Sequence, residues 1–562
     1  MSDAAVLYHE PGIVTILIQS SFILALNIVD FVLDKAIYCG LIGQILVGMA
    51  YGTPGGDILG LDIQQAITDL GYLGLILLVF EGGLSTDIHA LRQNLVLSSM
   101  VALTGIMLPI GISFVLIEIC NATILQAFAA GCALSSTSLG TTFTILKSSG
   151  LDNSRLGVVL TSAAMLDDVV GLVLVQVIGN LGNSAERGFT ATTVVRPVFV
   201  SIAYAILVPV LLLLAKVLMA KIDYSSLKHG KVMSLATSPR GRFLSHTALL
   251  LCALASAAYA GTSVLFAAYL AGLLISSASS LDARSETSVK STKAAKAKYA
   301  QPEASPAVTD LNASEAWEMV TPPAVATGPS EVAPEPSDAP PARQEELQQP
   351  RNANTGEEQA KMGDIDAGRQ TRSSGPEYLP GIYESYYANA VDRILKPLFF
   401  ASIGFSIPIT RLFDPSTLWR GVVYAVLMTI GKLACGLWLV RFSKLSPAEE
   451  AKSSSVSKAR SGLTKYRPKS LYPAGLLGNA MVARGEIGFL ISAIAQSNGI
   501  FEQDGARVDI FLVATWAILL CTIIGPVTVG LLTRRVKRLR NAAKASDNGR
   551  NDPLGVWADI KQ

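Results

Sequence analysis

The sequence predicts an all-α protein that crosses a membrane many times. Half of its 562 residues are hydrophobic and only 16% are charged. The mean hydropathy is +0.44, which is far above that of an average soluble domain. Apolar runs of about 20 residues, the length that spans a bilayer, recur along most of the chain. These observations favour a polytopic membrane protein with about 13 transmembrane helices.

The expected helices follow from the positions of these apolar runs. Most runs are long and nearly free of charge, while the second is short and rich in glycine. The segments lie near residues 13–33, 38–51, 69–86, 94–117, 124–146, 156–180, 194–219, 243–260, 262–280, 390–409, 418–440, 472–497 and 510–533.

The distribution of basic residues predicts the orientation of the chain. Lysine and arginine near membrane ends mark the cytosolic side. With the N-terminus outside or lumenal, alternate loops collect the positive charge and the C-terminus is cytosolic. The inner residues include Lys35, Arg92, Lys147, Arg155, Lys221, Arg240, Arg242, the basic stretch 441–469 and the basic run 534–540. The pattern leaves open whether the host membrane is the plasma membrane or an organelle membrane.

One long segment differs in kind from the rest. Residues 281–380 are rich in Ala, Pro, Glu, Gln and Ser and have almost no apolar periodicity, which predicts a disordered cytosolic linker. It divides a first membrane domain (1–280, helices 1 to 9) from a second (390–533, helices 10 to 13). A short basic cytosolic tail follows over 534–562.

The strongest sign of function is a pair of adjacent acids, Asp167 and Asp168, inside the apolar sixth segment. A carboxylate at the centre of a spanning helix costs about 3 kcal/mol on insertion scales, and such residues mark ion or substrate paths. We therefore take the pair as the candidate ion-binding and proton-binding site.

Two segments have the composition of interrupted helices. The fifth carries a glycine and hydroxyl cluster near 131–142 that includes Ser135, Ser136 and Thr137, and the twelfth is broken by glycines near 475–490. Freed carbonyls and hydroxyls can ligate a hard cation. Taken alone, however, the hydroxyls could simply bond to carbonyls of their own helix.

The two interrupted segments stand seven crossings apart, so they run antiparallel, as an inverted repeat requires. The fourth and sixth segments then correspond to the eleventh and thirteenth. This pairing brings Lys432, a cation within the eleventh segment, into one assembly with the aspartates, and Arg484 and Glu486 of the twelfth segment join it. Mutual pairing of such charges lowers the cost of burying them.

At this point the chain resembles the monovalent cation/proton antiporters, in particular the sodium/hydrogen exchangers and their Kef-like, electrogenic branch. The matching stretches are 80–84 (FEGGL), 133–138 (ALSSTS), 165–169 (MLDDV), 267–272 (AAYLAG), 397–404 (PLFFASIG), 431–432 (GK) and 484–486 (RGE).

The resemblance implies a sodium/proton antiporter-like fold in which two discontinuous helices cross beside the aspartates, and a homodimer. It also implies that Asp168 binds the transported Na⁺ or K⁺, that Asp167 pairs with Lys432, and that Ser136 and Thr137 assist.

The predicted function is exchange of Na⁺ or K⁺ for H⁺ by alternating access around the aspartate pair, in the lipid bilayer, without an enzymatic reaction, cofactor, structural metal or nucleic-acid partner. A cation channel or a transport-inactive membrane sensor is the main alternative. An intramembrane aspartyl protease is a remote one, because adjacent helical positions diverge by about 100°. The sequence leaves open the choice among Na⁺, K⁺ and Li⁺, and the stoichiometry.

Overall fold

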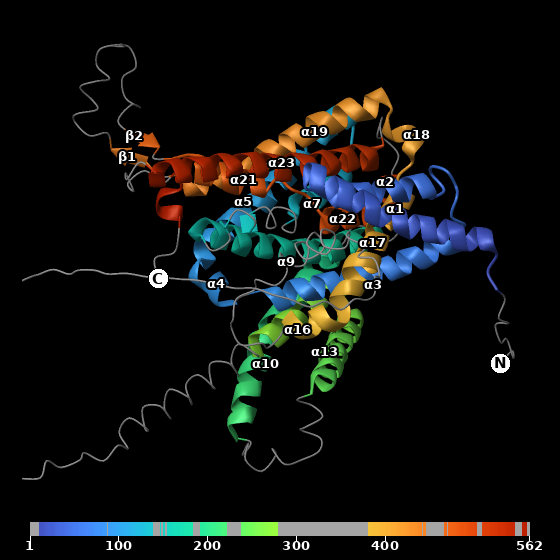
Figure 1. Cartoon of the computed structure of the whole chain (residues 1–562), viewed down its shortest axis with the longest axis horizontal. Coiled ribbons are helices and arrows are strands. Elements are labelled where there is room, and N and C mark those ends of the chain that lie inside the picture. The colour runs from blue at the N-terminus through green and yellow to red at the C-terminus, as the bar shows by residue number, and fades with distance from the viewer. Residues whose placement is uncertain are drawn as a thin grey trace, which may run out of the picture. The chain divides into compact units, whose positions relative to one another are not determined.

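Helices make up nearly all of the described chain in the computed structural model (Figure 1). The structure describes residues 10–86, 88–138, 146–147, 150–151, 154–183, 191–221, 238–278, 380–440, 442–444, 466–468, 470–502, 509–545 and 553–558. Apart from its last residue, the linker predicted over 281–380 lies outside these ranges.

Two helices of the first part begin at recognisable capping residues. Thr123 and Gln126 form a reciprocal capping box at the start of α7, and Ser238 caps α13 with Pro239 at its first position. These helices are α1 (Ile13–Ile37), α2 (Gly40–Tyr51), α3 (Leu61–Ser85), α4 (Ile88–Gln93), α5 (Leu95–Ser113), α6 (Leu116–Cys120), α7 (Ile124–Ser135), α9 (Arg155–Asn183), α10 (Ala191–Lys221), α13 (Pro239–Ala260) and a helix over Val264–Ala278.

The second part is also helical, apart from one short antiparallel ladder. Its helices are α16 (Pro380–Tyr383), the π-helical turns η1 (Glu384–Ala388) and η2 (Val391–Leu395), α17 (Lys396–Phe405), α18 (Ile409–Leu412), α19 (Pro415–Leu433), the 3-10 turn η3 (Ala434–Leu439), α21 (Tyr472–Ala480), α22 (Glu486–Ser497), α23 (Ile510–Ala545) and the 3-10 turn η4 (Gly555–Trp557). The ladder pairs β1 (Phe442–Lys444) with β2 (Tyr466–Pro468).

The described helices confirm a polytopic all-α membrane protein. Seven of them are long and apolar enough to cross a membrane, and further apolar helices are shorter. Each segment expected from the sequence coincides, within the described residues, with a helix or with helices separated by an interruption. The total number of crossings stays a prediction.

Two sets of helices pack in corresponding ways around the centre. In the first, α5 packs on α7 and α9, and α7 also packs on α9. In the second, α19 packs on α21 and α23, and α21 and α22 pack on α23. The sets join where α22 contacts α7 and α9, and where α19 contacts α5. This is the pairing that an inverted repeat of segments four to six and eleven to thirteen predicts.

A flanking group of helices packs through small residues. α17 contacts both α2 and α3, and α1 contacts α2. A Cβ added at Gly48 would stand 2.1 Å from the carbonyl oxygen of Ala401, and one at Gly404 would stand 2.3 Å from that of Ile45. Only glycine permits so close an approach of two helix backbones, as is common where membrane helices cross.

Candidate functional site

The two interrupted helices meet at their breaks. α7 ends at Ser135 and the backbone is non-helical over 136–138, after which the chain leaves the described residues until 146. The second break separates α21 from α22 over 481–485. The backbone N–H of Ser138 donates to the carbonyl of Ala483 at 2.9 Å. A Cβ at Gly485 would lie 2.4 Å from the Cβ of Ser138, so the crossing requires glycine there.

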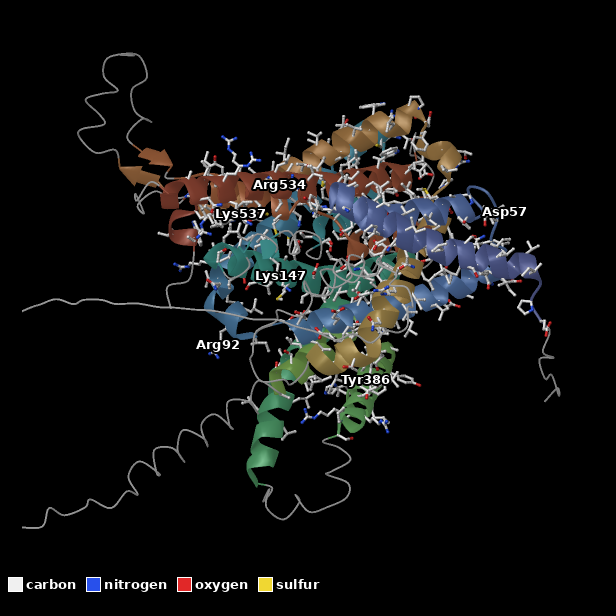
Figure 2. The ribbon with its side chains drawn as sticks, viewed as in Figure 1. Asp57, Arg92, Lys147, Tyr386, Arg534 and Lys537 are labelled. Carbon is white, nitrogen blue, oxygen red and sulfur yellow. The ribbon has the colours of Figure 1, made fainter. Side chains whose placement is uncertain are left out.

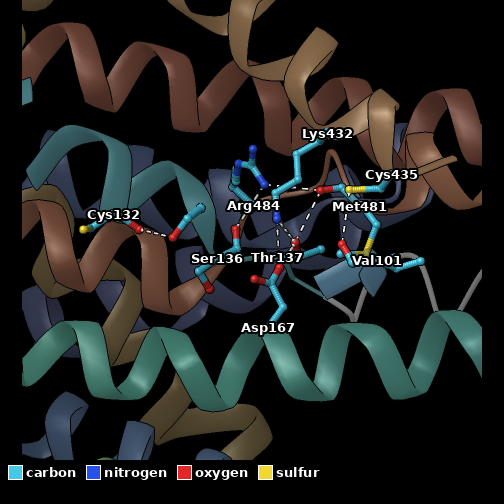
Figure 3. A network of polar contacts seen from close by, with 10 residues as sticks. Val101, Cys132, Ser136, Thr137, Asp167, Lys432, Cys435, Met481 and Arg484 are labelled. Atoms are coloured by element: carbon cyan, nitrogen blue, oxygen red, sulfur yellow. Dashed lines mark hydrogen bonds and ion pairs between the residues drawn. The ribbon is translucent and has the colours of Figure 1, made fainter. Parts of the chain in front are cut away.

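A fully buried ion pair lies beside this crossing (Figure 3). The Nζ atom of Lys432, on α19, lies 2.8 Å from Oδ2 of Asp167, on α9, and neither side chain is exposed. Either charge alone would be costly to bury, whereas the pair together offsets much of that penalty. The structure therefore brings together the eleventh and sixth segments at their charged residues.

Thr137 joins the first break to this ion pair. Its hydroxyl donates a very short hydrogen bond to Oδ2 of Asp167, and Nζ of Lys432 donates to the same hydroxyl at 2.6 Å. The carbonyl oxygen of Met481, in the second break, lies 3.4 Å from this hydroxyl as a further acceptor. One side chain thus links both breaks, α9 and α19.

Arg484 ties the two breaks together by a separate route. Its guanidinium is fully buried, and Nη1 donates to the carbonyls of Ser136 and Met481, each at 3.2 Å. Its Nε and Nη2 find no hydrogen-bond partner within the described residues. A cation held against carbonyls that the helices have released stabilises exposed backbone dipoles without neutralising a carboxylate.

Asp168 differs from its neighbour in its surroundings. Its side chain is only partly buried, whereas Asp167 is inaccessible. Within the described residues no hydrogen bond or ion pair holds the Asp168 carboxylate. Its nearest charged groups include Glu486, at the first position of α22 and also partly exposed, as well as Asp167 and Lys432. Glu486 itself stands where the N-terminal helix dipole favours an anion.

The remaining hydroxyls of the predicted cluster have local roles. Ser135 donates to the carbonyl of Cys132 one turn back at 2.8 Å, which is the within-helix bond that the sequence left open. Ser136 is buried and contributes its carbonyl to Arg484. The described hydrogen bonds of Thr137 go to the Asp167 ion pair and to Met481 rather than to Asp168.

Several residues of the site were not predicted from the sequence. Met481 contributes a backbone carbonyl, which no side-chain pattern reveals. The hydroxyl of Thr522, on α23, bonds to the carbonyl of Ile518 one turn back at 2.6 Å and lies 3.1 Å from the carbonyl of Arg484 as a second acceptor. The predicted repeat could have pointed to Thr522. It makes the thirteenth segment the counterpart of the sixth, and Thr522 is a polar residue within that apolar segment. The close approach of α5 at Gly105, where an added Cβ would lie 3.3 Å from Nζ of Lys432, had no such signal.

The geometry defines a class of protein before any comparison is made. Discontinuous helices that cross near buried charges, within two antiparallel repeats, are the architecture of secondary transporters. Among the described residues no cluster of three or more His, Cys, Asp or Glu side chains is placed to hold a metal.

Comparison with known proteins places the chain in a family. The family described as "Sodium/hydrogen exchanger, transmembrane" matches residues 22–296 and 378–535. The protein belongs to this sodium/hydrogen exchanger family, which confirms the resemblance to the monovalent cation/proton antiporters. Its place in the Kef-like, electrogenic branch stays a prediction.

Individual relatives match over shorter stretches. The high-affinity Na⁺/H⁺ antiporter NhaS3 of Synechocystis is 30% identical over 148 residues, which are 26% of this chain and 32% of that protein. The Na⁺/H⁺-K⁺ antiporter GerN of Bacillus cereus is 31% identical over 134 residues, 24% of this chain and 34% of GerN. The matched stretches thus span about a third of these relatives. The solved sodium proton antiporter MjNhaP1 of Methanocaldococcus jannaschii aligns with 96% of this chain at a TM-score of 0.47 and 13% identity.

Proposed function

We propose that this protein exchanges a monovalent cation for protons by alternating access, with Asp168 as the group that binds either one. The observation that carries the proposal is the unequal environment of the two acids. Asp167 is committed to Lys432 at 2.8 Å and is inaccessible, while Asp168 is partly accessible and holds no partner within the described residues. A carboxylate in that situation can accept a proton or a cation in turn.

The charge count of the site supports exchange of one ion for the other. When all five side chains are ionised, three acids (Asp167, Asp168 and Glu486) face two bases (Lys432 and Arg484), which leaves one negative charge in excess. In a low-dielectric interior an unbalanced charge is strongly disfavoured. Either one proton or one monovalent cation would restore neutrality, and the two would compete for the same position.

The names of the relatives guide the choice of substrate. NhaS3 is named for Na⁺ and H⁺, and GerN for Na⁺, H⁺ and K⁺. We propose Na⁺ or K⁺ as the cation here. The protease alternative loses support, because the two aspartates lie at adjacent positions of one helix and have different neighbours.

The proposed orientation places the N-terminus outside or in a lumen, and the C-terminus in the cytosol. Figure 2 shows Arg92, Lys147 and Lys537 toward one end of the helical bundle and Asp57 at the opposite end. Arg534 also contacts Tyr38, which lies between α1 and α2. Its guanidinium donates a hydrogen bond to the Tyr38 hydroxyl and lies over the Tyr38 ring. Basic residues gathered at one end support that end as cytosolic. The homodimer implied by the resemblance belongs to the same proposal.

The test is a proton-flux assay on protein reconstituted in liposomes, with the membrane potential clamped and Na⁺, K⁺ or Li⁺ added in turn. We expect wild type to move protons against at least one cation, and Asp168→Asn to lose that exchange. Asp57→Asn is the matched control, because Asp57 is an exposed acid and its left-handed backbone (φ 48°) tolerates asparagine.

Two outcomes would overturn the proposal. Full exchange in Asp168→Asn removes the assignment of the binding group. Cation flux without reciprocal proton movement in wild type identifies a channel instead.

A further inference from the structure

A short C-terminal segment, Pro553–Ala558, packs onto the membrane domain; we call it the strap. It follows α23 after residues that the structure does not describe. Leu554 is 1% exposed and Trp557 is 6% exposed, and the turn between them has Gly555 in the left-handed region (φ 56°). A tail that merely follows the last helix would have no reason to bury its two largest apolar side chains.

The strap attaches to the first turn of the helix that carries the two aspartates. The carbonyl of Ala558 accepts a hydrogen bond from the N–H of Arg155 at 3.1 Å, and Arg155 is the first residue of α9. The first N–H groups of a helix have no partner within the helix, so the strap supplies one. The guanidinium of Arg155 also lies 5.8 Å from the ring centroid of Trp557, within the range of a cation–π contact.

A second attachment reaches the interrupted helix of the other repeat. Ser470, which precedes α21, donates a hydrogen bond from its hydroxyl to the carbonyl of Pro553. The strap therefore spans the ends of α9 and α21, the two helices whose other parts contribute Asp167 and the second break.

One continuous apolar cluster connects the strap to the ion site. Its buried members include Leu554 and Trp557 of the strap, Leu156 and Leu160 of α9, and Met481 of the second break. The carbonyl of Met481 accepts from Arg484 and lies 3.4 Å from the Thr137 hydroxyl.

The same cluster also comes close to the lysine of the ion pair. Cys435 is a buried member of the cluster, and its thiol donates to the carbonyl of Val101. A methyl group placed on Gly105 would stand 3.3 Å from the Cys435 sulfur, the Met481 methyl and Nζ of Lys432 alike. Close-packed interiors transmit displacement rather than absorbing it.

We propose that the strap positions the ion-binding helix: Trp557 and Leu554 fix the first turn of α9 against α21, and through this cluster set the geometry around Asp167, Lys432 and Met481. These are positioning residues, because they pack at the first turn of α9 and not at the aspartates. The inference rests on the proposed exchange function and adds a distant determinant of the affinity of that site.

The test compares Trp557→Ala with Trp557→Phe and Val556→Ala in reconstituted protein. Trp557→Ala should raise the apparent KM for the transported cation by about 2- to 30-fold, the range for coupling through packed networks, and should shift the pH profile of exchange. Trp557→Phe should restore most of the wild-type KM. Val556, 55% exposed on the same strap, is the matched control and should leave both readouts unchanged.

A second variant covers a failure of Trp557→Ala to fold. Gly555→Ala adds a methyl group with nothing within 4 Å but disfavours the left-handed turn, so it should produce a smaller change in the same direction. Lowered thermal stability with an unchanged KM and pH profile in both variants would overturn the proposal. If wild type shows no exchange, thermal stabilisation by added cation still reports the affinity of the site. Equal stabilisation of wild type and Trp557→Ala by the cation would overturn the role proposed for the strap, whether or not the protein is an exchanger.

Discussion

Replacement of Lys432 by methionine tests the ion pair on which the site is built. Methionine keeps the length and flexibility of the side chain but removes its charge, leaving Asp167 buried with an unpaired carboxylate. The two charged atoms lie 2.8 Å apart, so their gross attraction at an effective dielectric constant near 20 is about 6 kcal/mol. Part of this is offset by desolvation, and loss of one partner from a buried pair costs about 3–5 kcal/mol.

The decisive measurement is a double-mutant cycle on the free energy of unfolding in mixed micelles. Lys432→Met and Asp167→Asn should each destabilise by about 3–5 kcal/mol. The double variant should recover much of that loss, because no buried charge is left unpaired. We expect an interaction energy of at least about 2 kcal/mol.

The control for this cycle is Lys35→Met. Lys35 is exposed on α1, and its removal should change the stability by less than about 1 kcal/mol. Additive losses in the double variant would refute the reasoning, because they would mean that Lys432 and Asp167 do not stabilise one another. In proton-flux assays Lys432→Met should also alter the pH profile, since Asp167 would then need a proton to be buried.

Three further predictions follow from the site and its surroundings. Thr137→Val should destabilise by about 1–3 kcal/mol in the same unfolding assay, because it removes a hydroxyl that bonds both members of the ion pair; Ser135→Ala, which loses only a bond within its own helix, should cost less. Gly485→Ala should greatly reduce the yield of folded protein in size-exclusion chromatography, because the added methyl group collides with the first break. Gly111→Ala, with nothing within 4 Å of the added methyl, should leave the yield unchanged. Burial raises the pKa of Asp509, which precedes α23, although bonds from the helix N–H groups oppose that shift. Wild type should therefore lose stability as pH rises from the ordinary pKa of an aspartate through this raised pKa. Asp509→Asn, an equally good cap, should not show that loss. The same dependence of thermal stability on pH in wild type and variant would contradict the prediction.

A topological argument placed Lys432 in one assembly with the two acids, although Lys432 and Asp167 are 265 positions apart in the chain. Two glycine-broken segments separated by an odd number of crossings imply antiparallel repeats, and repeats place their equivalent helices around one centre. The choice of Asp167 rather than Asp168 as the partner came from the family resemblance. The argument needed only the order of the helices, which hydropathy supplies, and not the directions of any side chains.

The partners of Thr137 and Arg484 could not be predicted in this way. Both depend on how two unwound segments cross, and the direction of a side chain in non-helical backbone is not periodic. No sequence pattern predicts that the guanidinium of Arg484 bonds to the carbonyl of Ser136 rather than to a carboxylate. Likewise, helical structure begins at Pro380, before the helix expected near 390–409. Tyr383 is buried against α3 and stabilises this extension. Charged residues between 383 and 396 interrupt the apolar pattern, so hydropathy does not reveal it.

The adjacency of the two acids explains how one helix can hold both a fixed and an exchangeable charge. Successive positions on a helix point about 100° apart, so a carboxylate that pairs with Lys432 on α19 leaves its neighbour pointing in a different direction. Asp167 forms an ion pair with Lys432, and Thr137 connects this pair, and with it α9, to the first break. Asp168 directly follows this anchored residue on α9 but does not share its partner. A rigid neighbour thus holds a free carboxylate at a fixed place, which is what selective binding of a small ion requires. Exchange of the two residues' roles would demand rotation of α9 against its packed surface, so we expect Asp167→Asn to damage stability and Asp168→Asn to damage transport.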